Sequence, residues 1–472
     1  MRSCFVRFAV PMVFGALTTA QGQLVIPRTV PVLQQEQFAI IPSVRAPMGG
    51  VSIAFDDSLA DPFINPALAS MVKHNMVFGA PFNHNVTFGH GGGRTLPLGG
   101  MTSNGDWATA FVFAVQDLDH QANSNKLNMG WYNRYGQVSV ARRLPDDLSV
   151  GASVYVARLN AMDGFDLLYD GSDAITQVGT LTDFRLGATK HWGDRRLDLL
   201  LLNSNTDITH SVQYDYSTYL PGGQGGEAVR EIDQNFDRTH IWGAHARFVQ
   251  PLDDGWRFGW TATANHLSHP KIPDYDIRTV SFVRWDPGAT NAFNFGLGIG
   301  RTTDRSSYGL DFIQEPMTSR TWGEDATGAH TVDNDFKFAN TRLRLGYSRD
   351  AYLTPSGSAA LGVQFGLDVY HVSYHIDQAD HVSGISRSSD ENWQEVTPTF
   401  GMHLRVKGAT VQYNYRLTCT GDCNPLGMGD KVDVAAPSVG FIAAPTTRVN
   451  VNGGTSRFHQ LTVTLPLAGT RN

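Results

Sequence analysis

The feature that most constrains this chain is an alternation in which every second residue is apolar and the residues between are polar or small. The clearest examples are the segments 148–159, 361–370 and 409–417. In the first of them, Val150 and Val154 fall on one face, whereas Ser149 and Ser153 fall on the other. A period of two is that of a β-strand, since successive side chains point to opposite faces of a sheet. Segments of about ten residues with one apolar and one polar face are typical of transmembrane β-barrels.

The way in which the chain could cross a membrane is also restricted. After position 22, no run of about 18 or more apolar residues occurs, so the sequence excludes transmembrane helices. A closed barrel is the other structure that satisfies all backbone hydrogen bonds in lipid. A soluble β-sandwich also shows alternation, but the long segments here favour the barrel.

Connections between the alternating segments are short and long in turn. Short turns rich in Gly, Pro and Asp are expected at 144–147, 192–195, 251–255, 302–305 and 406–408, with a slightly longer one at 349–358. Long polar stretches are expected near 118–126, 160–179, 207–237, 269–290, 317–335, 377–394 and 419–455. With a first strand near 106–117 and a last one near 457–467, this predicts an all-β, antiparallel transmembrane barrel of about fourteen strands.

Composition agrees with an outer-membrane barrel and argues against nucleic-acid binding. Charged residues make up 17% of the 472 residues, compared with about 25% in a typical soluble domain. The net charge of -7 lacks the basic footprint that nucleic-acid-binding proteins show. Trp192 and Trp256 lie beside short turns and Trp242, Trp322 and Trp393 lie near long stretches, as expected for aromatic girdles at the two membrane surfaces.

The first 22 residues have the pattern of a secretory signal peptide. Arg2 and Arg7 are followed by a short apolar run and by small residues near Ala20. Residues 1–22 are therefore expected to be cleaved, and the mature chain to reach a Gram-negative-type outer membrane, where outer-membrane lipid and the barrel-assembly machinery are its expected partners. Cys4 leaves with the signal, and Cys419 and Cys423 are expected to form a disulfide in this oxidising compartment.

The predicted inward face carries several arginines that would be costly in lipid. The candidates for lining the lumen are Arg185, Arg247, Arg257, Arg342, Arg344, Arg405 and Arg416. At mid-depth on the lipid face each would cost about 2–4 kcal/mol, so they are expected to face water or one another. Two interpretations remain: a structural salt-bridge network, which we favour, or a track for a solute.

A long segment, 23–105, precedes the first clear strand, and residues 106–472 are assigned to the barrel. The segment is long enough to fold back into the lumen as a hatch or plug. It contains Asn65-Pro66-Ala67, which resembles the hatch motif of FadL/TodX-type outer-membrane transporters of fatty acids and aromatic hydrocarbons. The hairpin Ser139–Ala152 is also similar to the second and third strands of that family. The resemblance implies a fourteen-stranded barrel with an N-terminal hatch, uptake by diffusion, a ligand pocket and a lateral opening in the wall.

The function predicted from these observations is passive passage of hydrophobic compounds, such as long-chain fatty acids or hydrocarbons, across the outer membrane. The alternatives are a general porin for polar solutes and a barrel with a structural or surface-interaction role. An enzyme is the weakest alternative. It would depend on His266-Leu267-Ser268-His269, where no third group orients a Ser–His pair. No cofactor and no metal ion are expected.

Overall fold

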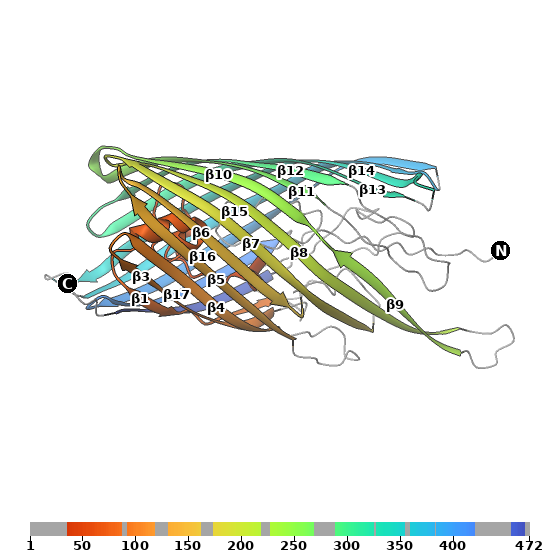
Figure 1. The fold of residues 1–472 in the computed structure, drawn as a ribbon, viewed down its shortest axis with the longest axis horizontal. Helices are drawn as coiled ribbons and strands as arrows, with labels where there is room; N and C mark the ends of the chain where they lie inside the picture. The colour runs from red at the N-terminus through yellow and green to blue at the C-terminus, as the bar shows by residue number, and fades with distance from the viewer. Residues whose placement is uncertain are drawn as a thin grey trace.

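The computed structural model describes residues 35–86, 92–118, 131–161, 173–218, 227–268, 288–324, 327–354, 359–382, 384–420 and 455–467. Most of them form one antiparallel sheet (Figure 1). Its strands are β1 (Met76–Gly79), β2 (Phe82–Val86), β3 (Gly92–Asn104), β4 (Trp107–Leu118), β5 (Trp131–Leu144), β6 (Leu148–Leu159), β7 (Ala174–Trp192), β8 (Arg195–Thr218), β9 (Glu227–Asp237), β10 (His240–Pro251), β11 (Trp256–Ser268), β12 (Ala289–Thr302), β13 (Ser306–Glu324), β14 (His330–Leu353), β15 (Ala359–Asp380), β16 (Ile385–Val406), β17 (Ala409–Thr420) and β18 (Thr455–Pro466). Among these described residues, no helix is long and apolar enough to cross a membrane.

The sheet closes on itself, and two of its wall strands are interrupted. β1 and β2 both pair with β3 on one side and β18 on the other, so together they form one wall strand. Backbone hydrogen bonds bridge the interruption, from Ala80 N to Pro97 O (2.9 Å) and from Leu461 N to Pro81 O (3.0 Å). β9 and β10 similarly share the edge of β8. The result is a closed barrel of 16 strands.

The prediction of about fourteen strands was therefore too low by one pair. The fourteen predicted segments are all present as β4–β8 and β10–β18. The additional wall strands are β1 with β2, and β3, formed by residues that were expected to lie ahead of the barrel. Their alternation is broken by Pro81, Pro97 and several glycines, since proline cannot donate to the ladder and glycine has no side chain to mark a face. The wall thus begins at Met76 rather than near position 106.

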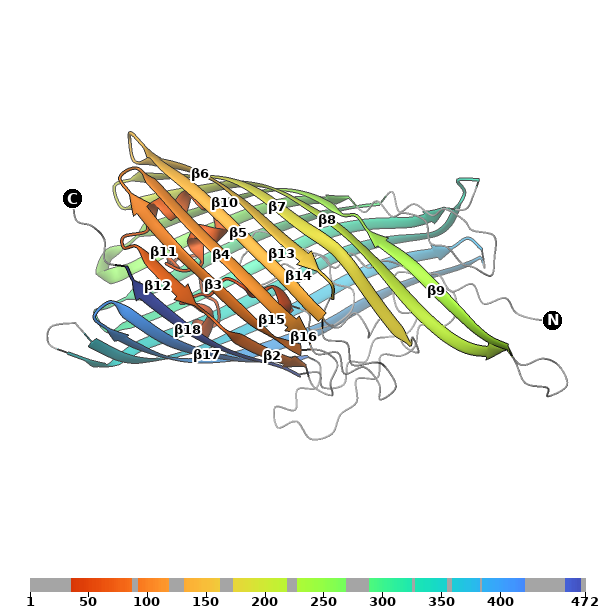
Figure 2. The same cartoon turned by 60° about the horizontal axis from the view of Figure 1, so that its bottom comes forward.

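The two faces of the wall differ as the alternation predicts. Large apolar side chains that point away from the interior are exposed, among them Leu98, Phe113, Val154, Phe184, Leu201, Phe295, Leu345, Phe365 and Leu461. Their neighbours in sequence, which point inward, are buried and mostly polar or small. Such an apolar outer belt is what lipid requires of a spanning barrel. The turns are short at the end marked C in Figure 1, and β8 and β14, with 24 residues each, reach far beyond the belt at the other end (Figures 1 and 2).

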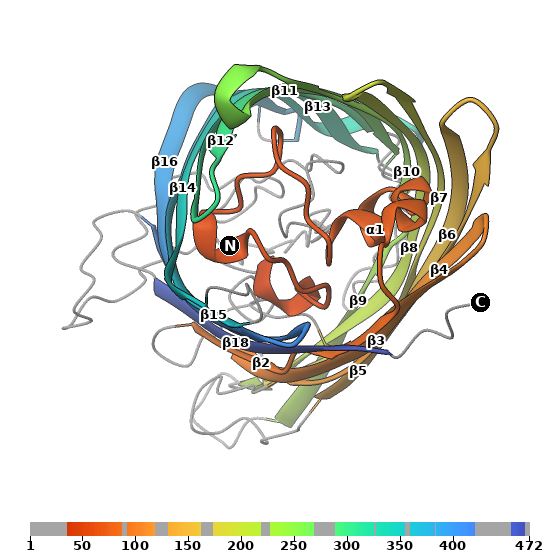
Figure 3. The ribbon, with the colours of Figure 1, turned by 90° about the vertical axis from the view of Figure 1, so that its left-hand side faces the viewer.

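The chain between Gln35 and Asn75 lies inside the barrel. Viewed along the barrel axis, its short helices are surrounded by the strands (Figure 3). They are η1 (Gln35–Phe38), η2 (Ala46–Met48), α1 (Asp61–Ile64) and η3 (Pro66–Met71). η3 lies near the short turns, against Gly151 and Gly187, whereas η1 lies at the long-loop ends of β4 and β6, where Gln37 donates to Ala161 O (2.8 Å) and accepts from Gln116 (2.7 Å). We refer to residues 35–75 as the lumenal segment.

Candidate functional site

The lumenal segment consists of short helices, and three of them have a proline near the start. Pro47, Pro62 and Pro66 each occupy the first or second position of η2, α1 and η3, where the missing N–H of proline costs nothing. Asp57 fixes the loop before α1, because its carboxylate accepts hydrogen bonds from the backbone N–H of Leu59 and Ala60, both at 3.0 Å. None of these helices is longer than six residues, so contacts with the wall hold the segment in place.

Asn65, Pro66 and Ala67 form one of these contacts. The Asn65 side chain accepts a hydrogen bond from Ala67 N (3.1 Å), which caps η3, and donates one to Leu199 O of β8 (3.1 Å). A Cβ atom at Gly187 of β7 would lie 1.9 Å from Asn65 Oδ1, and one at Gly151 of β6 would lie 2.6 Å from Ala67 N. The motif therefore begins a helical turn and at the same time seats that turn against two glycines of the wall.

A row of four glycines forms the seat on the opposite side of the lumen. Gly300, Gly309, Gly346 and Gly366 are register partners across β12, β13, β14 and β15. A Cβ atom at Gly366 would lie 1.9 Å from Gly49 N, and one at Gly346 would lie 2.3 Å from Met48 O. At Gly300 and Gly309 a Cβ atom would lie 2.4 Å from the ring of Phe55. Because no side chain intervenes, the lumenal segment packs directly on the backbone of the wall.

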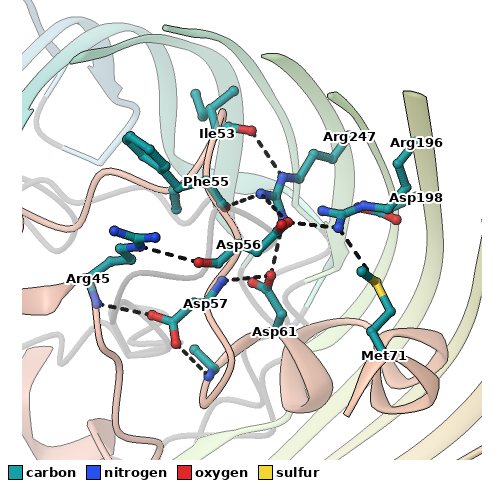
Figure 4. Close-up of polar contacts among 12 residues, drawn as sticks. Arg45, Ile53, Phe55, Asp56, Asp57, Asp61, Met71, Arg196, Asp198 and Arg247 are labelled. Atoms are coloured by element: carbon teal, nitrogen blue, oxygen red, sulfur yellow. Dashed lines mark hydrogen bonds and ion pairs between the residues drawn. The ribbon is translucent and has the colours of Figure 1, made fainter. Parts of the chain in front are cut away.

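Arginines of the wall meet two aspartates of the lumenal segment, Asp56 and Asp61 (Figure 4). Asp56 forms ion pairs with Arg196 (2.7 Å), Arg257 (3.1 Å) and Arg247 (3.8 Å). Arg247 also donates to Ile53 O (3.1 Å) and to Phe55 O, and its guanidinium lies 3.5 Å from Asp61. These wall arginines come from β8, β10 and β11. The cluster ties the segment to the wall through charge as well as through packing.

The pKa values of the two carboxylates nearest to Arg247, those of Asp56 and Asp61, are shifted in opposite directions. Burial alone would raise the pKa of Asp56, but Arg196, Arg247 and Arg257 more than offset it, so the pKa lies below its ordinary value. Burial raises the pKa of Asp61 to about 6; Arg247 opposes this rise, and the neighbouring Asp57 and Asp56 carboxylates add to it. Asp61 is therefore the group in this cluster that gains a proton under mildly acidic conditions.

We expect Asp61→Asn to remove most of the pH dependence of segment seating between about pH 4.5 and 7.5. The pKa of Asp61 in the seated state, about 6, exceeds that of an exposed aspartate, about 3.9. Its contribution to seating is therefore fully present below about pH 4 and is lost as the pH rises through about 6. In planar bilayers, the open probability of the wild-type barrel should rise roughly tenfold across this range, whereas that of the variant should stay nearly constant. A variant profile that matches the wild type would contradict this role of Asp61.

A second ion cluster lies across the lumen on β13, β14 and β15. Arg342 donates to Asp368 (2.8 Å), and Arg344 lies 3.6 Å from the same carboxylate. Arg344 also donates to Gly50 O (3.3 Å). Asp311 accepts hydrogen bonds from the backbone N–H groups of Ser52 (2.8 Å) and Ile53 (3.2 Å). The turn at 49–53 is thus held by side chains of two of these strands, and Arg342 is joined to it through Asp368.

The other predicted lumenal arginines also point inward and have partners. Arg185 pairs with Asp183 (2.7 Å) and donates to Ile64 O (3.1 Å), so it belongs to the same contact surface. Arg416 pairs with Glu36 at the start of the segment. Arg405 is apart from the rest, since it pairs with Asp350 of the wall near the short turns. The structure therefore brings most of the predicted arginines to the lumenal segment, either directly or, for Arg342, through a shared carboxylate.

On β8 and β10–β15, a band of the inner face farther towards the long-loop end carries apolar and aromatic side chains, and we call this band the apolar ring. The buried residues of this apolar ring are Leu200, Leu202, Ile241, Leu267, Ala292, Met317, Phe336, Phe338, Tyr374 and Ile376, and Trp393 packs against them. The rings of Phe338 and Tyr374 are 5.2 Å apart, and those of Tyr374 and Trp393 are 6.3 Å apart. Each of the buried residues lies farther along its strand from the short turns than the residues that hold the segment.

The acidic side of this site was not predicted from the sequence. The wall arginines were singled out, but not Asp56, Asp57 and Asp61, which lie within six residues of one another in an otherwise largely uncharged stretch. That local density of carboxylates was the available signal. The glycines of the wall were recognised only as small residues within the alternation.

The remaining sequence predictions are only partly covered by the structure. Residues 1–22, His269 and Cys423 lie outside the described residues, so the signal peptide and the Cys419–Cys423 disulfide stay predictions. His266 Nδ1 contacts Asn291 Oδ1 (2.9 Å), and Ser268 donates to His240 O (3.4 Å), so these contacts do not form a Ser–His pair. The described part of the chain has no group of three or more His, Cys, Asp or Glu residues that could hold a metal ion.

Comparisons with known proteins find other outer-membrane barrels. No family model matches the sequence, and no curated protein matches it either. The chain is similar in structure to a Pseudomonas aeruginosa FadL homologue (TM-score 0.47, 12% identity, 91% of this chain and 99% of that one). It is also similar to the Ralstonia pickettii toluene transporter TbuX (0.44, 10%, 90% and 98%) and to the TodX monoaromatic hydrocarbon channel (0.41, 12%, 88% and 96%).

Barrels with other cargo match as well, among them a bacterial polysaccharide outer membrane secretin at a TM-score of 0.38. None of these four proteins is described as an enzyme. At these TM-scores and identities the similarity carries no conclusion about the solute, which has to be inferred from the residues themselves.

Proposed function

We propose that this protein is an outer-membrane passive transporter for hydrophobic compounds, such as long-chain fatty acids or hydrocarbons, and that the lumenal segment is its hatch. The apolar ring carries the proposal. A water-filled pore for polar solutes has a polar lining, whereas small hydrophobic molecules bind in concave, largely aromatic surfaces. Phe336, Phe338, Tyr374 and Trp393 gather such aromatic side chains on the inner face of the wall, between the segment and the long-loop end.

The seat of the lumenal segment supports its role as a hatch. A barrel of 16–18 strands leaves an aqueous channel unless something fills it. Here the segment contacts the wall through the glycine row on β12–β15, through Gly151 and Gly187, and through the arginine cluster. Contacts on opposite sides of the lumen are what a segment that closes the passage requires. The ion pairs and hydrogen bonds that hold the segment can also break and re-form, which the passage of a solute requires.

A general porin is the second candidate, and the arginines favour it. Five of the predicted ones, however, bind carboxylates or backbone carbonyls of the lumenal segment. Arg342 is paired with Asp368 of the wall. These pairs are close enough to neutralise most of the positive charge, so the network interpretation accounts for the arginines better than a track for anions does.

The apolar ring can be tested directly with Phe338→Ala. Fully burying a phenylalanine side chain contributes about 1.5–3 kcal/mol, so we expect the variant to bind a fluorescent long-chain fatty acid at least about tenfold more weakly than the wild type. Binding is measured by titration of the detergent-solubilised barrel, and heat-modifiable mobility verifies that the variant is folded.

Phe312→Ala is the matched control, because Phe312 lies on the neighbouring strand β13 but is exposed on the lipid face. It should leave the affinity unchanged. Equal affinities for all three proteins, together with a large steady ion conductance of the wild type, would favour the porin instead.

A further inference from the structure

A polar recess interrupts the apolar outer belt on β17, β18, β2 and β3. Tyr415, His459, Asn83 and Arg94 are register partners across these four strands. Arg457 and Asn85 are also register partners, two residues farther along β18 and β2. All of these residues except Tyr415 are exposed, and they alternate with buried inner-face residues such as Phe458 and His84. We call Asn83, Asn85, Arg94, Arg457, His459 and Tyr415 the outer recess.

The surface is hollowed at this place. One hollow of about 210 Å³ is lined by Asn83, Asn85, Arg457 and His459. A second, of about 410 Å³, shares Arg457 and His459 and continues to Phe400, Tyr413 and Tyr415. The His459 ring lies 4.8 Å from the ring of Tyr415, and its Nδ1 is 2.8 Å from the Tyr413 hydroxyl. The recess therefore combines cations and amides with a fixed aromatic surface.

The depth of the recess limits what can occupy it. β18 runs from Thr455 at the long-loop end to Pro466 at the short-turn end, and Arg457 lies near its beginning. Leu461 and Leu465, closer to the short turns, continue the apolar belt. An arginine facing lipid costs about 2–4 kcal/mol at the midplane but only about 0–1 kcal/mol near the interface. The recess thus lies at the level of the headgroups on the long-loop side, which is the outer leaflet.

The two arginines of the recess are not engaged in ion pairs within the part of the chain that the structure describes. Arg457 has no acidic register partner, and Arg94 lies opposite Asp117 of β4 without an ion pair between them. Guanidinium groups bind phosphate through paired, charge-assisted hydrogen bonds. The amides of Asn83 and Asn85 can both donate and accept, which suits sugar hydroxyls, and an aromatic face such as that of Tyr415 packs against a sugar ring.

We propose that the outer recess binds the headgroup of a phosphorylated glycolipid of the outer leaflet. Arg457 and Arg94 would hold a phosphate, and the asparagines with Tyr415 and His459 would hold the sugar to which it is attached. A simple phospholipid would use the arginines but leave the amide and aromatic surface without a partner. The proposal rests on the outer-membrane placement of the barrel and not on the identity of its solute.

The test is binding of defined lipids to the mature protein in detergent, followed by native mass spectrometry. The probes are lipid A with its two phosphates, the same lipid A without phosphates, and phosphatidylglycerol. We expect the wild type to prefer phosphorylated lipid A at least about tenfold over the other two. Arg94→Gln combined with Arg457→Gln should lower that affinity about tenfold, because charged hydrogen bonds to phosphate are lost and solvent screens part of their contribution. Arg457→Lys should lower it less than the double glutamine variant does, because the positive charge remains while the paired hydrogen bonds of the guanidinium are lost.

Arg142→Gln is the matched control. Arg142 lies at the short-turn end and stacks on the exposed Trp107 at 5.3 Å, so it is a cation at the opposite membrane surface. It should leave lipid A binding unchanged. Equal binding of phosphorylated and phosphate-free lipid A, equal binding of phosphatidylglycerol, or an equal loss in Arg142→Gln would each overturn the proposal. Uptake of a hydrophobic solute into phospholipid vesicles is measured in parallel and should not differ between these variants, so the two proposals fail separately.

Discussion

Deletion of residues 35–72 should turn the barrel into an open pore. These residues form most of the lumenal segment and its contacts with both sides of the wall, and a 16-stranded barrel without a filling has an aqueous channel. In planar bilayers we expect single-channel conductance to rise at least about tenfold over the wild type. The deletion has to end before Met76, because β1 is part of the wall and pairs with β3 and β18.

Adding the missing segment back to the deletion variant should also restore the closed state. A synthetic peptide with the sequence of residues 35–75, added from the short-turn side, should lower the conductance again, because the glycine seats and Arg247 remain in the wall. Heat-modifiable mobility verifies that the shortened chain forms a barrel. An unchanged conductance in a folded deletion variant would show that the lumenal segment does not close the passage.

The wall could be predicted from the sequence because its physical cause is local and repeated. Lipid on one side and a filled interior on the other impose the same alternation on every strand. Segments such as Leu148–Leu159 can therefore be recognised as strands from the sequence alone. The first two wall strands were not predicted because they lack that regularity. Pro81 divides one of them, and Gly99 and Gly100 leave the other without side chains at two positions. Both exceptions occur where the chain passes from the lumen into the wall.

The candidate site could be predicted only on the side of the wall. The inward position of Arg247 follows from the alternation and from the cost of an arginine in lipid. Nothing in the sequence, however, pairs position 247 with Asp61, because the lumenal segment has no period and the two residues are far apart along the chain. Asn65-Pro66-Ala67 was recognised by resemblance, while its partners Gly151 and Gly187 could not be identified before the chain was folded.

The glycines on the inner face belong both to the wall, which could be predicted, and to the site, which could be predicted only in part. On the inner face of a barrel, a single glycine in the alternation carries little information, since any small residue fits beside water. Four glycines in register on adjacent strands are different, because together they leave a strip of the inner wall without side chains. Another segment can then pack directly on the backbone of this strip, and here it is the turn from Met48 to Phe55. In the proposed hatch, closure therefore depends on shape, with the ion pairs adding affinity.

Gly346→Val combined with Gly366→Val should accordingly unseat the lumenal segment while leaving the barrel intact. A Cβ atom at these positions would lie 2.3 Å from Met48 O and 1.9 Å from Gly49 N, and both contacts are with backbone that cannot rotate away. Overpacking costs about 1–3 kcal/mol per site, so the two substitutions together should raise the open population at least about 30-fold. Valine itself is favourable in a strand, which keeps the wall folded.

Two measurements follow this change, conductance in planar bilayers and tryptic cleavage after the half-buried Arg45, which is shielded while the segment is seated. Gly136→Val is the matched control, since a Cβ atom at Gly136 of β5 would have no other atom within 4 Å. It should change neither conductance nor cleavage. If the double variant closed as tightly as Gly136→Val, the segment would have to be held by its ion pairs alone, and Asp56 and Arg247 would become the residues that decide whether the passage is open.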